Sequence, residues 1–235
     1  MSSWNIDAPH LSEQGSGDDH RTVRFRDRKD AGQRLAERLG PMLGQDLVVL
    51  GLPRGGVPVA AEVARALRAP LDVIVVRKLG VPGQPELAMG AVGEGGVRVV
   101  DERVLRLAHV AAEDLERAGD RERDELDRCV RRFRGGRDPV PVTGRIAVVV
   151  DDGIATGSTA LAACSVARAL GAARVVFAAP VCARESARRL AADVDELVCL
   201  HSPRHFTAVG QFYDDFSQTE DDEVLELLLR AGGTG

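Results

Sequence analysis

The sequence predicts an α/β protein built on a doubly wound, mostly parallel five-stranded sheet. Short apolar, β-branched runs alternate with amphipathic segments of helical period along most of the 235 residues. Hydrophobic residues make up 44% of the chain but aromatic residues only 3%, so we expect a core of aliphatic strands and Ala-rich helices. Because no repeat or low-complexity linker divides the chain, residues 21–235 are predicted to form one domain after a disordered polar tail at 1–20.

Periodicity and turn residues place the alternating elements. The run at 46–52 ends in Pro53, Gly55 and Gly56, which predicts a buried strand that enters a tight loop. A helix and a second apolar run follow, so this stretch is expected to form a right-handed crossover between parallel strands. The predicted strands are 46–52, 71–76, 145–150, 174–179 and 196–200, and the predicted helices are 30–39, 57–68, 156–170, 184–192 and 221–230.

Three segments depart from this alternation. Residues 79–100 are rich in glycine and are predicted to be a long irregular segment, which is typical of functional or mobile loops. Residues 102–134 are predicted to be a helical insertion. Its apolar face is marked by Leu126, Cys129, Val130 and Phe133. Residues 201–235 are expected to form a small C-terminal hood of loop and helix.

The bulk properties exclude several classes of partner. A net charge of -5 argues against a chain-wide basic surface for nucleic acid or anionic membranes. Residues 1–20 do not resemble a signal peptide, and no run approaches the ~18 apolar residues of a membrane span. The four cysteines form no C-x-x-C pair, which favours buried thiols over disulfides or metal ligands. We therefore expect a cytoplasmic protein.

The strongest functional pattern is the segment 148–160, VVVDDGIATGSTA. An apolar strand runs directly into Asp151 and Asp152, and a loop with glycines and hydroxyl side chains then leads into a helix. Such strand ends open into the ligand crevice of α/β proteins. Free backbone N–H groups at a helix start suit a phosphate monoester, whereas two carboxylates suit hydroxyl groups or a hydrated Mg²⁺ ion. The pattern predicts a site for a phosphorylated sugar bound with a metal.

Two simpler interpretations explain less. A helix N-cap accounts for one aspartate, but not for two that follow a buried strand. A Walker-type phosphate loop is excluded because the chain has no G-x-x-x-x-G-K-[ST] pattern.

The segment VVVDDGIATGST resembles the motif with which type I phosphoribosyltransferases bind 5-phosphoribosyl-1-pyrophosphate (PRPP). The resemblance implies that Asp151 and Asp152 engage the ribose hydroxyls and hold a Mg²⁺ cofactor through water. It also implies that the following loop binds the 5′-phosphate; the residues expected there are Gly153, Ala155, Thr156, Gly157, Ser158 and Thr159. The sequence departs from the motif at Gly153, where many members have a larger apolar residue.

A second resemblance concerns residues 50–64, LGLPRGGVPVAAEVA, which look like the family's pyrophosphate loop. Arg54, Gly55 and Gly56 offer a cation and free amides, and family loops of this kind often contain a non-proline cis peptide. From the residues alone, an ordinary glycine turn stays an alternative.

Arg77 and Lys78 are expected to end the second strand and to point into the same crevice. In related enzymes a basic residue here contacts PRPP; solvated edge charges are the alternative. The segment 79–100 then takes the position of the family's mobile loop, which closes over the site. The resemblance covers most of residues 22–230 and is closest to a group of bacterial phosphoribosyltransferase-like proteins with PRGG, RKLG and a long helix at 102–134.

The resemblance implies a glycosyltransferase of nucleotide metabolism. We expect it to transfer the 5-phosphoribosyl group of PRPP to a nitrogen nucleophile, with a nucleobase as the expected acceptor, and to release pyrophosphate. The expected catalytic residues are Asp151, Asp152, Arg54 and Lys78. A regulator that senses PRPP or a nucleotide without turnover is the alternative, and a homodimer stays open.

An aromatic cluster distinguishes the C-terminal segment: Phe206, Phe212, Tyr213 and Phe216. These residues either fill the core or form the floor of a base pocket, because stacking on aromatic rings holds a base.

Overall fold

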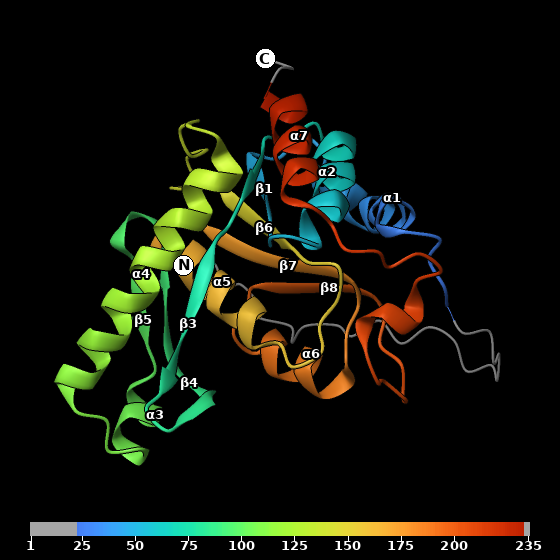
Figure 1. Cartoon of the computed structure of the whole chain (residues 1–235). Coiled ribbons are helices and arrows are strands. Elements are labelled where there is room, and N and C mark those ends of the chain that lie inside the picture. Colours follow the sequence, from blue (N-terminus) through green and yellow to red (C-terminus); the bar gives the residue numbers. More distant parts are fainter. Residues whose placement is uncertain (1–22, 233–235) are drawn as a thin grey trace, which may run out of the picture.

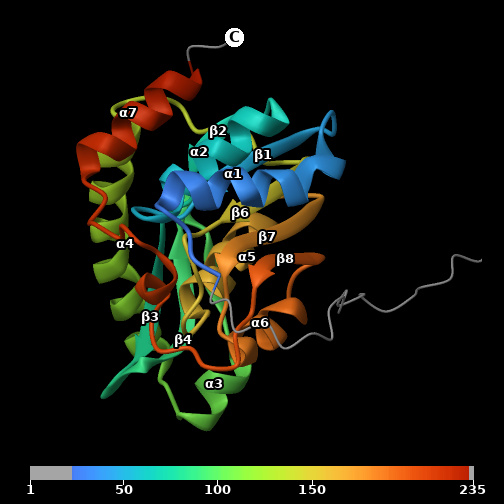
Figure 2. The same ribbon diagram turned by 90° about the vertical axis from the view of Figure 1, so that its right-hand side faces the viewer.

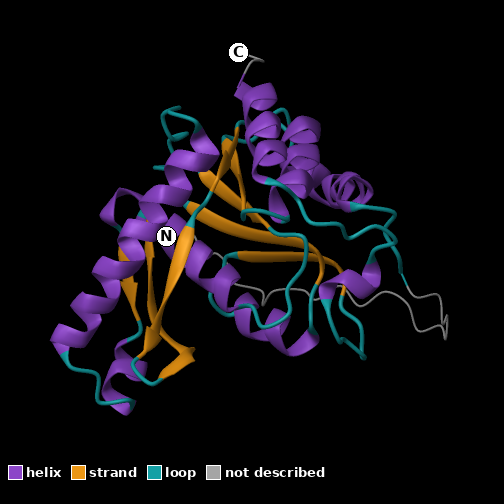
Figure 3. Cartoon of the chain, viewed as in Figure 1, coloured by secondary structure: helices purple, strands orange, loops and turns teal. Residues whose placement is uncertain are grey.

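The centre of the protein is a sheet of five parallel strands in the order β2-β1-β6-β7-β8 (Figures 1 and 3). It is seen in a computed structural model that describes residues 23–232, except for the side chains of Pro85 and Glu86; the predicted tail at 1–20 lies outside these residues. The strands are β1 (Leu47–Gly51), β2 (Leu71–Val73), β6 (Ile146–Val150), β7 (Arg174–Val181) and β8 (Glu196–His201). The predicted fold class is confirmed.

Helices cover both faces of this sheet, as a doubly wound fold requires. Val49 and Val148 pack on the side of α1, α2 and α7, whereas Val48 and Val149 pack on the side of α5 and α6. Successive strand residues point to opposite faces, so strands buried on both sides are continuously apolar. The helices are α1 (Arg28–Leu39), α2 (Gly56–Leu67), α5 (Ser158–Ala169), α6 (Arg184–Ala191) and α7 (Asp221–Gly232), and a 3₁₀ turn, η1 (Gly40–Met42), follows α1.

The segment 79–100 is not irregular, so that prediction is wrong. It belongs to a second, antiparallel sheet of β3 (Val76–Val81), β4 (Gln84–Gly93) and β5 (Arg98–Val100), with a 3₁₀ turn, η2 (Glu94–Gly96), before the last strand. The predicted strand at 71–76 is therefore split between two sheets.

The abundance of glycine in this segment suggested a loop, but two of the glycines allow close packing within ordered structure. A Cβ on Gly90 would lie 2.4 Å from the carbonyl oxygen of Val99, and one on Gly93 would lie 2.3 Å from Val166 Cγ1. Leu79 and Met89 are fully buried against α4. Glycine here admits neighbouring backbone and side chains that any larger residue would exclude.

The predicted insertion at 102–134 consists of two helices, α3 (Glu102–Leu107) and α4 (Ala112–Arg134), rather than one. His109 has a positive φ of 50°, which interrupts the helix between them. The predicted apolar face of α4 is confirmed, since its members lie in or against the core cluster below α7: Leu126, Cys129, Val130 and Phe133. None of the helices within residues 23–232 is both long and apolar enough to cross a membrane.

A buried ionic cluster joins α4 to both sheets. Arg134 Nε donates to Asp72 Oδ1 of β2 at 3.1 Å, and Arg134 Nη1 pairs with Glu94 of η2. Asp72 Oδ2 also accepts from the backbone N–H of Val140 at 2.9 Å. Because buried charges need such partners, this cluster fixes where the second sheet stands against the first.

The C-terminal segment crosses the carboxyl ends of the main strands before it turns away as α7. A 3₁₀ turn, η3 (Val209–Phe212), packs with Phe25, Phe212 and Tyr213 in a small core cluster. Helix α7 then lies against α2 and α4 (Figure 2). The segment therefore contacts both the end of the sheet and the inserted helix.

Candidate functional site

The two predicted acidic residues lie at the carboxyl end of the central strand β6. The N–H of Asp151 donates to the carbonyl of Ala178 at 3.2 Å, so the pairing with β7 continues one residue past the strand. The N–H of Asp152 then donates to Asp151 Oδ1 at 2.9 Å. This bond fixes the rotation of the Asp151 carboxylate and leaves its Oδ2 for other partners.

The glycines of the 50–64 segment press directly against this acidic pair. A Cβ on Gly55 would lie 2.1 Å from Asp152 Oδ2, and one on Gly56 would lie 2.6 Å from the carbonyl oxygen of Val150. Only glycine permits this approach. The peptide between Pro53 and Arg54 is cis, as the family resemblance implied. Two segments about a hundred positions apart thus form one site.

The loop at 153–159 is anchored by the backbone of β7 and by α6. The N–H of Ile154 donates to the carbonyl of Val181 at 2.8 Å, and the carbonyl of Ala155 accepts from Ser186 Oγ at 2.6 Å. Gly157, with a φ of 78°, then turns the chain into α5. The side chains of Thr156 and Thr159 stay exposed. β7 and α6 therefore fix one side of the loop, while its hydroxyls and the start of α5 remain accessible on the other.

The departure from the family motif at Gly153 has a steric reason. A Cβ there would lie 2.5 Å from Val209 Cγ1 and 2.9 Å from Val181 Cγ1. Val209 of η3 thus occupies the space that a larger residue at position 153 would need. The hood segment and the loop are fitted to one another.

The two neighbouring cations Arg77 and Lys78 do not point the same way. Arg77 lies within β3, and its Nε donates to Glu122 Oε2 of α4 at 2.9 Å. Because strand neighbours point to opposite faces, Lys78 lies on the face of Val76, which packs on the α5 side. The prediction that Arg77 and Lys78 enter the same crevice is therefore wrong.

Arg54 extends from the glycine loop toward the start of α7. Its Nη1 lies 3.7 Å from Asp221 Oδ1, and the amide oxygen of Gln218, turned toward Arg54, accepts from both terminal nitrogens at 3.1 Å. Arg132 of α4 pairs with the same Asp221. Asp221 of the C-terminal helix thus lies between Arg54 of the glycine loop and Arg132 of the inserted helix.

Two residues of the site were missed by the sequence analysis. Arg28, the first residue of α1, contacts Asp152 Oδ2 through its Nε at 2.8 Å. The Tyr213 hydroxyl donates to the carbonyl of Asp152 at 2.6 Å. A signal for Arg28 was present, because a cation in the first turn of a helix opposes the helix dipole and needs a separate reason.

Burial dominates the electrostatics of the acidic pair. Desolvation, followed by the charge of Asp152, raises the pKa of Asp151 well above its usual value. Desolvation also raises the pKa of Asp152, although Arg28 opposes this rise. A ligand that brings a hydroxyl donor or a cation stabilises the charged form of such carboxylates, so its binding is favoured.

The acidic pair offers few protein ligands for a metal. Within residues 23–232, no group of three or more His, Cys, Asp and Glu side chains is arranged to hold an ion. Mg²⁺, however, commonly binds through one or two carboxylates together with water and substrate phosphates. The donor set therefore fits a Mg²⁺ that arrives with a phosphorylated ligand.

The aromatic cluster mainly fills the core. Phe212 and Tyr213 are buried, and Phe206 stacks on Phe212 with ring centroids 5.7 Å apart. Phe216 is 37% exposed, but the Arg28 guanidinium lies over its ring at 4.1 Å from the centroid. Phe216 is thus the member of the cluster that borders the acidic pair.

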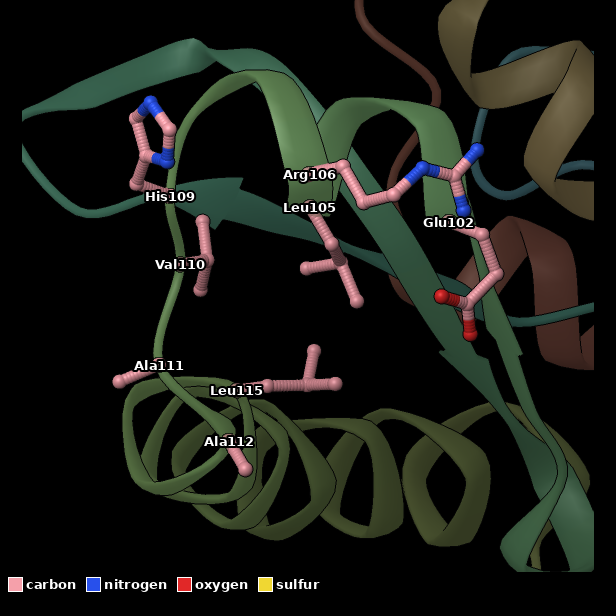
Figure 4. Close-up of a pocket in the computed structure, with 8 residues that line it drawn as sticks. All are labelled: Glu102, Leu105, Arg106, His109, Val110, Ala111, Ala112 and Leu115. Atoms are coloured by element: carbon pink, nitrogen blue, oxygen red, sulfur yellow. The ribbon is translucent and has the colours of Figure 1, made fainter.

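Two cavities lie away from these residues. One of about 570 Å³ opens between α3 and the start of α4, where Leu105, His109 and Leu115 line it (Figure 4). The other, of about 430 Å³, lies beside the Arg134 cluster. Neither is lined by the acidic pair or the 153–159 loop.

Comparison with known proteins identifies the family. Residues 28–217 match the model of the phosphoribosyl transferase domain. Two curated Mycobacterium tuberculosis proteins, from strains CDC 1551 and H37Rv, are provisionally named phosphoribosyl transferases and are 58% identical over 207 residues, or 88% of this chain. The chain spans about half of their length, 47%. The crystal structure of TT1426 from Thermus thermophilus matches with a TM-score of 0.83 and 49% identity, over 88% of this chain and 98% of that one. The chain belongs to the phosphoribosyl transferase domain family, and its doubly wound sheet is the type I fold that the sequence predicted.

Proposed function

We propose that the chain is a phosphoribosyltransferase. It binds PRPP with Mg²⁺ and transfers the 5-phosphoribosyl group to a nitrogen nucleophile, with a nucleobase as the expected acceptor. The bond between ribose C1 and the pyrophosphate oxygen breaks, and pyrophosphate leaves with the electron pair. The new bond joins C1 to the nitrogen, which then releases a proton to water.

One observation carries this proposal: each carboxylate of the acidic pair has one oxygen held by the protein and one left over. Asp151 Oδ1 accepts from the backbone, and Asp152 Oδ2 is taken by Arg28 beside Gly55. The other oxygen of each group has no hydrogen bond to the described part of the chain. Two adjacent acceptors of this kind suit the two neighbouring hydroxyls of a ribose.

The loop at 153–159 supports binding of the 5′-phosphate. Its carbonyls at Ala155 and Thr156 are turned toward α6, where they accept from Ser186 and Arg189. Backbone N–H groups at the start of α5 are then available to an anion, together with the helix dipole. The hydroxyls of Thr156 and Ser158, 3.1 Å apart, can donate further bonds.

Arg54 and the amide of Gly55 support the pyrophosphate part of the site, and Lys78 is the second cation that we assign to it. The N–H of Gly56 donates to the carbonyl of Leu52 at 3.0 Å, so Gly56 contributes close packing rather than a free amide. Bound Mg²⁺ supplies positive charge to the pyrophosphate oxygens. The chain itself orients the leaving group and the ribose, and no side chain need act as a covalent nucleophile. Electrostatic stabilisation is thus the expected source of catalysis. All four cysteines are free, which fits the reducing cytoplasm in which we place the reaction.

Pyrophosphate release from PRPP and Mg²⁺, measured with a panel of purine and pyrimidine bases, tests the function. We expect release with at least one base, and none from the double variant Asp151→Asn, Asp152→Asn. PRPP binding without release for every base would instead support a PRPP-sensing regulator. Failure to bind PRPP would remove both interpretations.

A further inference from the structure

Arg28 joins the acidic pair to the C-terminal segment through three separate contacts. Its Nε donates to Asp152 Oδ2 at 2.8 Å, and its Nη1 donates to the carbonyl of Ser217 at 2.6 Å. The face of its guanidinium lies over the ring of Phe216 at 4.1 Å. Segments from near the two ends of the described chain thus meet at the Arg28 guanidinium.

The burial of this ion pair indicates a role beyond surface charge. The side chains of Arg28 and Asp152 are each only 13% exposed. A guanidinium at the first residue of a helix is also repelled by the helix dipole. Pairing a buried charge in this way often adds little stability compared with apolar residues, so stability alone is a poor explanation for Arg28.

Neighbouring backbone decides which oxygen of Asp152 the pair uses. Gly55 packs so closely that a Cβ there would lie 2.1 Å from Oδ2 and 3.1 Å from Arg28 Nε. Oδ2 is thus enclosed by α1 and the glycine loop, and Oδ1 is left for a ligand. The Tyr213 hydroxyl holds the Asp152 carbonyl at 2.6 Å, which fixes the backbone behind the same carboxylate.

We propose that Arg28 is a positioning residue, which with Phe216 and Ser217 behind it fixes the Asp152 carboxylate so that Oδ1 meets a ribose hydroxyl. The inference rests on the proposed function of the acidic pair. Through Phe216 and Ser217, the C-terminal segment then takes part in ribose recognition, although it lies more than fifty positions after the loop at 153–159. Lysine would replace this device poorly, because one ammonium cannot reproduce the planar guanidinium's contacts on two edges and a face.

Arg28→Met and Arg34→Met form a matched pair of variants to test the inference. Arg34 lies on the same helix, pairs with Asp30 at 2.8 Å and covers Phe25 at 5.3 Å from the ring centroid. We expect Arg28→Met to weaken ribose 5-phosphate and PRPP·Mg²⁺ by about ten- to a hundredfold, the range for a charged hydrogen bond. Binding of pyrophosphate without Mg²⁺ should stay unchanged, because it involves neither the ribose nor a metal held by Asp152. Arg34→Met should change none of the three.

A double-mutant cycle separates positioning from a structural role. In the Asp152→Asn background, Arg28→Met should weaken ribose 5-phosphate by less than about threefold, because Arg28 acts through that carboxylate. Arg28→Lys should recover part of the lost affinity, and Phe216→Leu should lose part of it. If Arg28→Met does not fold, Arg28→Lys and Phe216→Leu decide the question: each should weaken ribose 5-phosphate and leave pyrophosphate binding unchanged.

A lower melting temperature with unchanged ligand affinities would overturn the inference, as would equal weakening of ribose 5-phosphate and pyrophosphate. These outcomes leave the proposed function intact if the unaltered protein binds PRPP and releases pyrophosphate. An unaltered protein that binds neither ribose 5-phosphate nor PRPP would overturn both.

Discussion

At the scale of single residues, Gly55 is the position where the smallest change should have the largest effect on the site. It has ordinary helical dihedrals, with φ -63° and ψ -29°, so alanine would meet no backbone strain. Its Cβ would instead force Asp152 and Arg28 to move. We expect Gly55→Ala to cost about 1–3 kcal/mol of stability by overpacking and to abolish stabilisation by ribose 5-phosphate in a thermal melt.

Gly40 provides the control for this substitution. It also has helical dihedrals, with φ -47° and ψ -37°, and no atom lies within 4 Å of a Cβ built there. Gly40→Ala should leave ligand binding unchanged and stability equal or slightly higher, since alanine restricts the unfolded chain. Normal ligand binding by Gly55→Ala would contradict the assignment of this contact to the site.

Arg54 and Lys78 are expected to act on the pyrophosphate end of the ligand. Arg54→Ala and Lys78→Ala should therefore weaken pyrophosphate more than ribose 5-phosphate in titration calorimetry, because both cations lie outside the loop at 153–159, which we propose binds the 5′-phosphate. Arg132→Ala is the control for Arg54, since Arg132 pairs with the same Asp221 from α4. Equal weakening of both ligands would show that the pyrophosphate position is wrong.

At the scale of elements, the buried cluster around Arg134 should determine how firmly the second sheet is attached. The side chains of Arg134 and Asp72 are 8% and 3% exposed. Arg134→Met would leave two buried carboxylates without their cation, which typically costs about 3–5 kcal/mol. Urea unfolding should show this loss at neutral pH.

The deficit of Arg134→Met should depend on pH. Desolvation already raises the pKa of Glu94, although Arg134 opposes the rise, and removal of Arg134 would raise it further. An acid with a higher pKa in the folded state binds protons more tightly when folded, so stability rises as pH falls through that pKa. The deficit should therefore shrink as the pH falls from neutral through the raised pKa of Glu94 toward its ordinary value of 4.5.

Arg137→Met is the control for this pH dependence. Arg137 donates to the carbonyls of Leu228 and Arg134, at 2.8 and 3.3 Å, rather than to a carboxylate. Its loss should cost some stability, but equally at each pH. A deficit of Arg134→Met that stays constant with pH would mean that Glu94 and Asp72 find other partners.

The segment 79–100 remains our candidate for the element that closes over the site, although its strands are ordered. Its tip is lightly packed, since Leu87 is 41% exposed. Hydrogen exchange should therefore be faster at the tip than in α4 and should slow when PRPP·Mg²⁺ and a base analogue bind. Slow exchange throughout, with no change on binding, would mean that another element shields the site.

At the scale of the whole molecule, filling the site should stabilise the fold. A ligand at about 100 times its dissociation constant adds about 2.7 kcal/mol, which corresponds to a shift of about 5–10 °C in melting temperature for a chain of this size. The double variant Asp151→Asn, Asp152→Asn should lose most of this shift. Its own melting temperature should change little, because the removal of buried charge offsets the lost pair with Arg28.

Local sequence patterns were sufficient to predict most of the main sheet and the two motifs at its carboxyl edge. Strand β6, the acidic pair and the loop to α5 are consecutive in the chain, so periodicity and turn chemistry place them without knowledge of the rest. The glycine loop before α2 was likewise predicted at the correct strand end. A parallel sheet brings such ends to one edge, which is why two distant motifs could be expected to meet.

Local patterns failed where a choice of partner decided the structure. The runs at 71–76 and 79–100 have the composition of strand and loop, but the structure divides them between two sheets. Within the second sheet Gly90 fits closely against Val99, and Gly93 fits closely against Val166 of α5. Arg77 turned toward α4 because the alternation of β3 placed it on that face. Such choices depend on contacts between residues that are distant in the sequence, so a local stretch of sequence cannot predict them.

The sequence by itself determined the fold class and the position of the acidic pair and the loop at 153–159 at a strand end, because each depends on residues close together in the chain. Only the tertiary structure decided that Arg28 and Phe216 lie beside the acidic pair. Arg28 lies 124 positions from Asp152, and Phe216 approaches from the opposite end of the chain. Their contact follows from how α1 and the hood pack on the sheet, since a charged hydrogen bond forms only once burial brings both groups to one place.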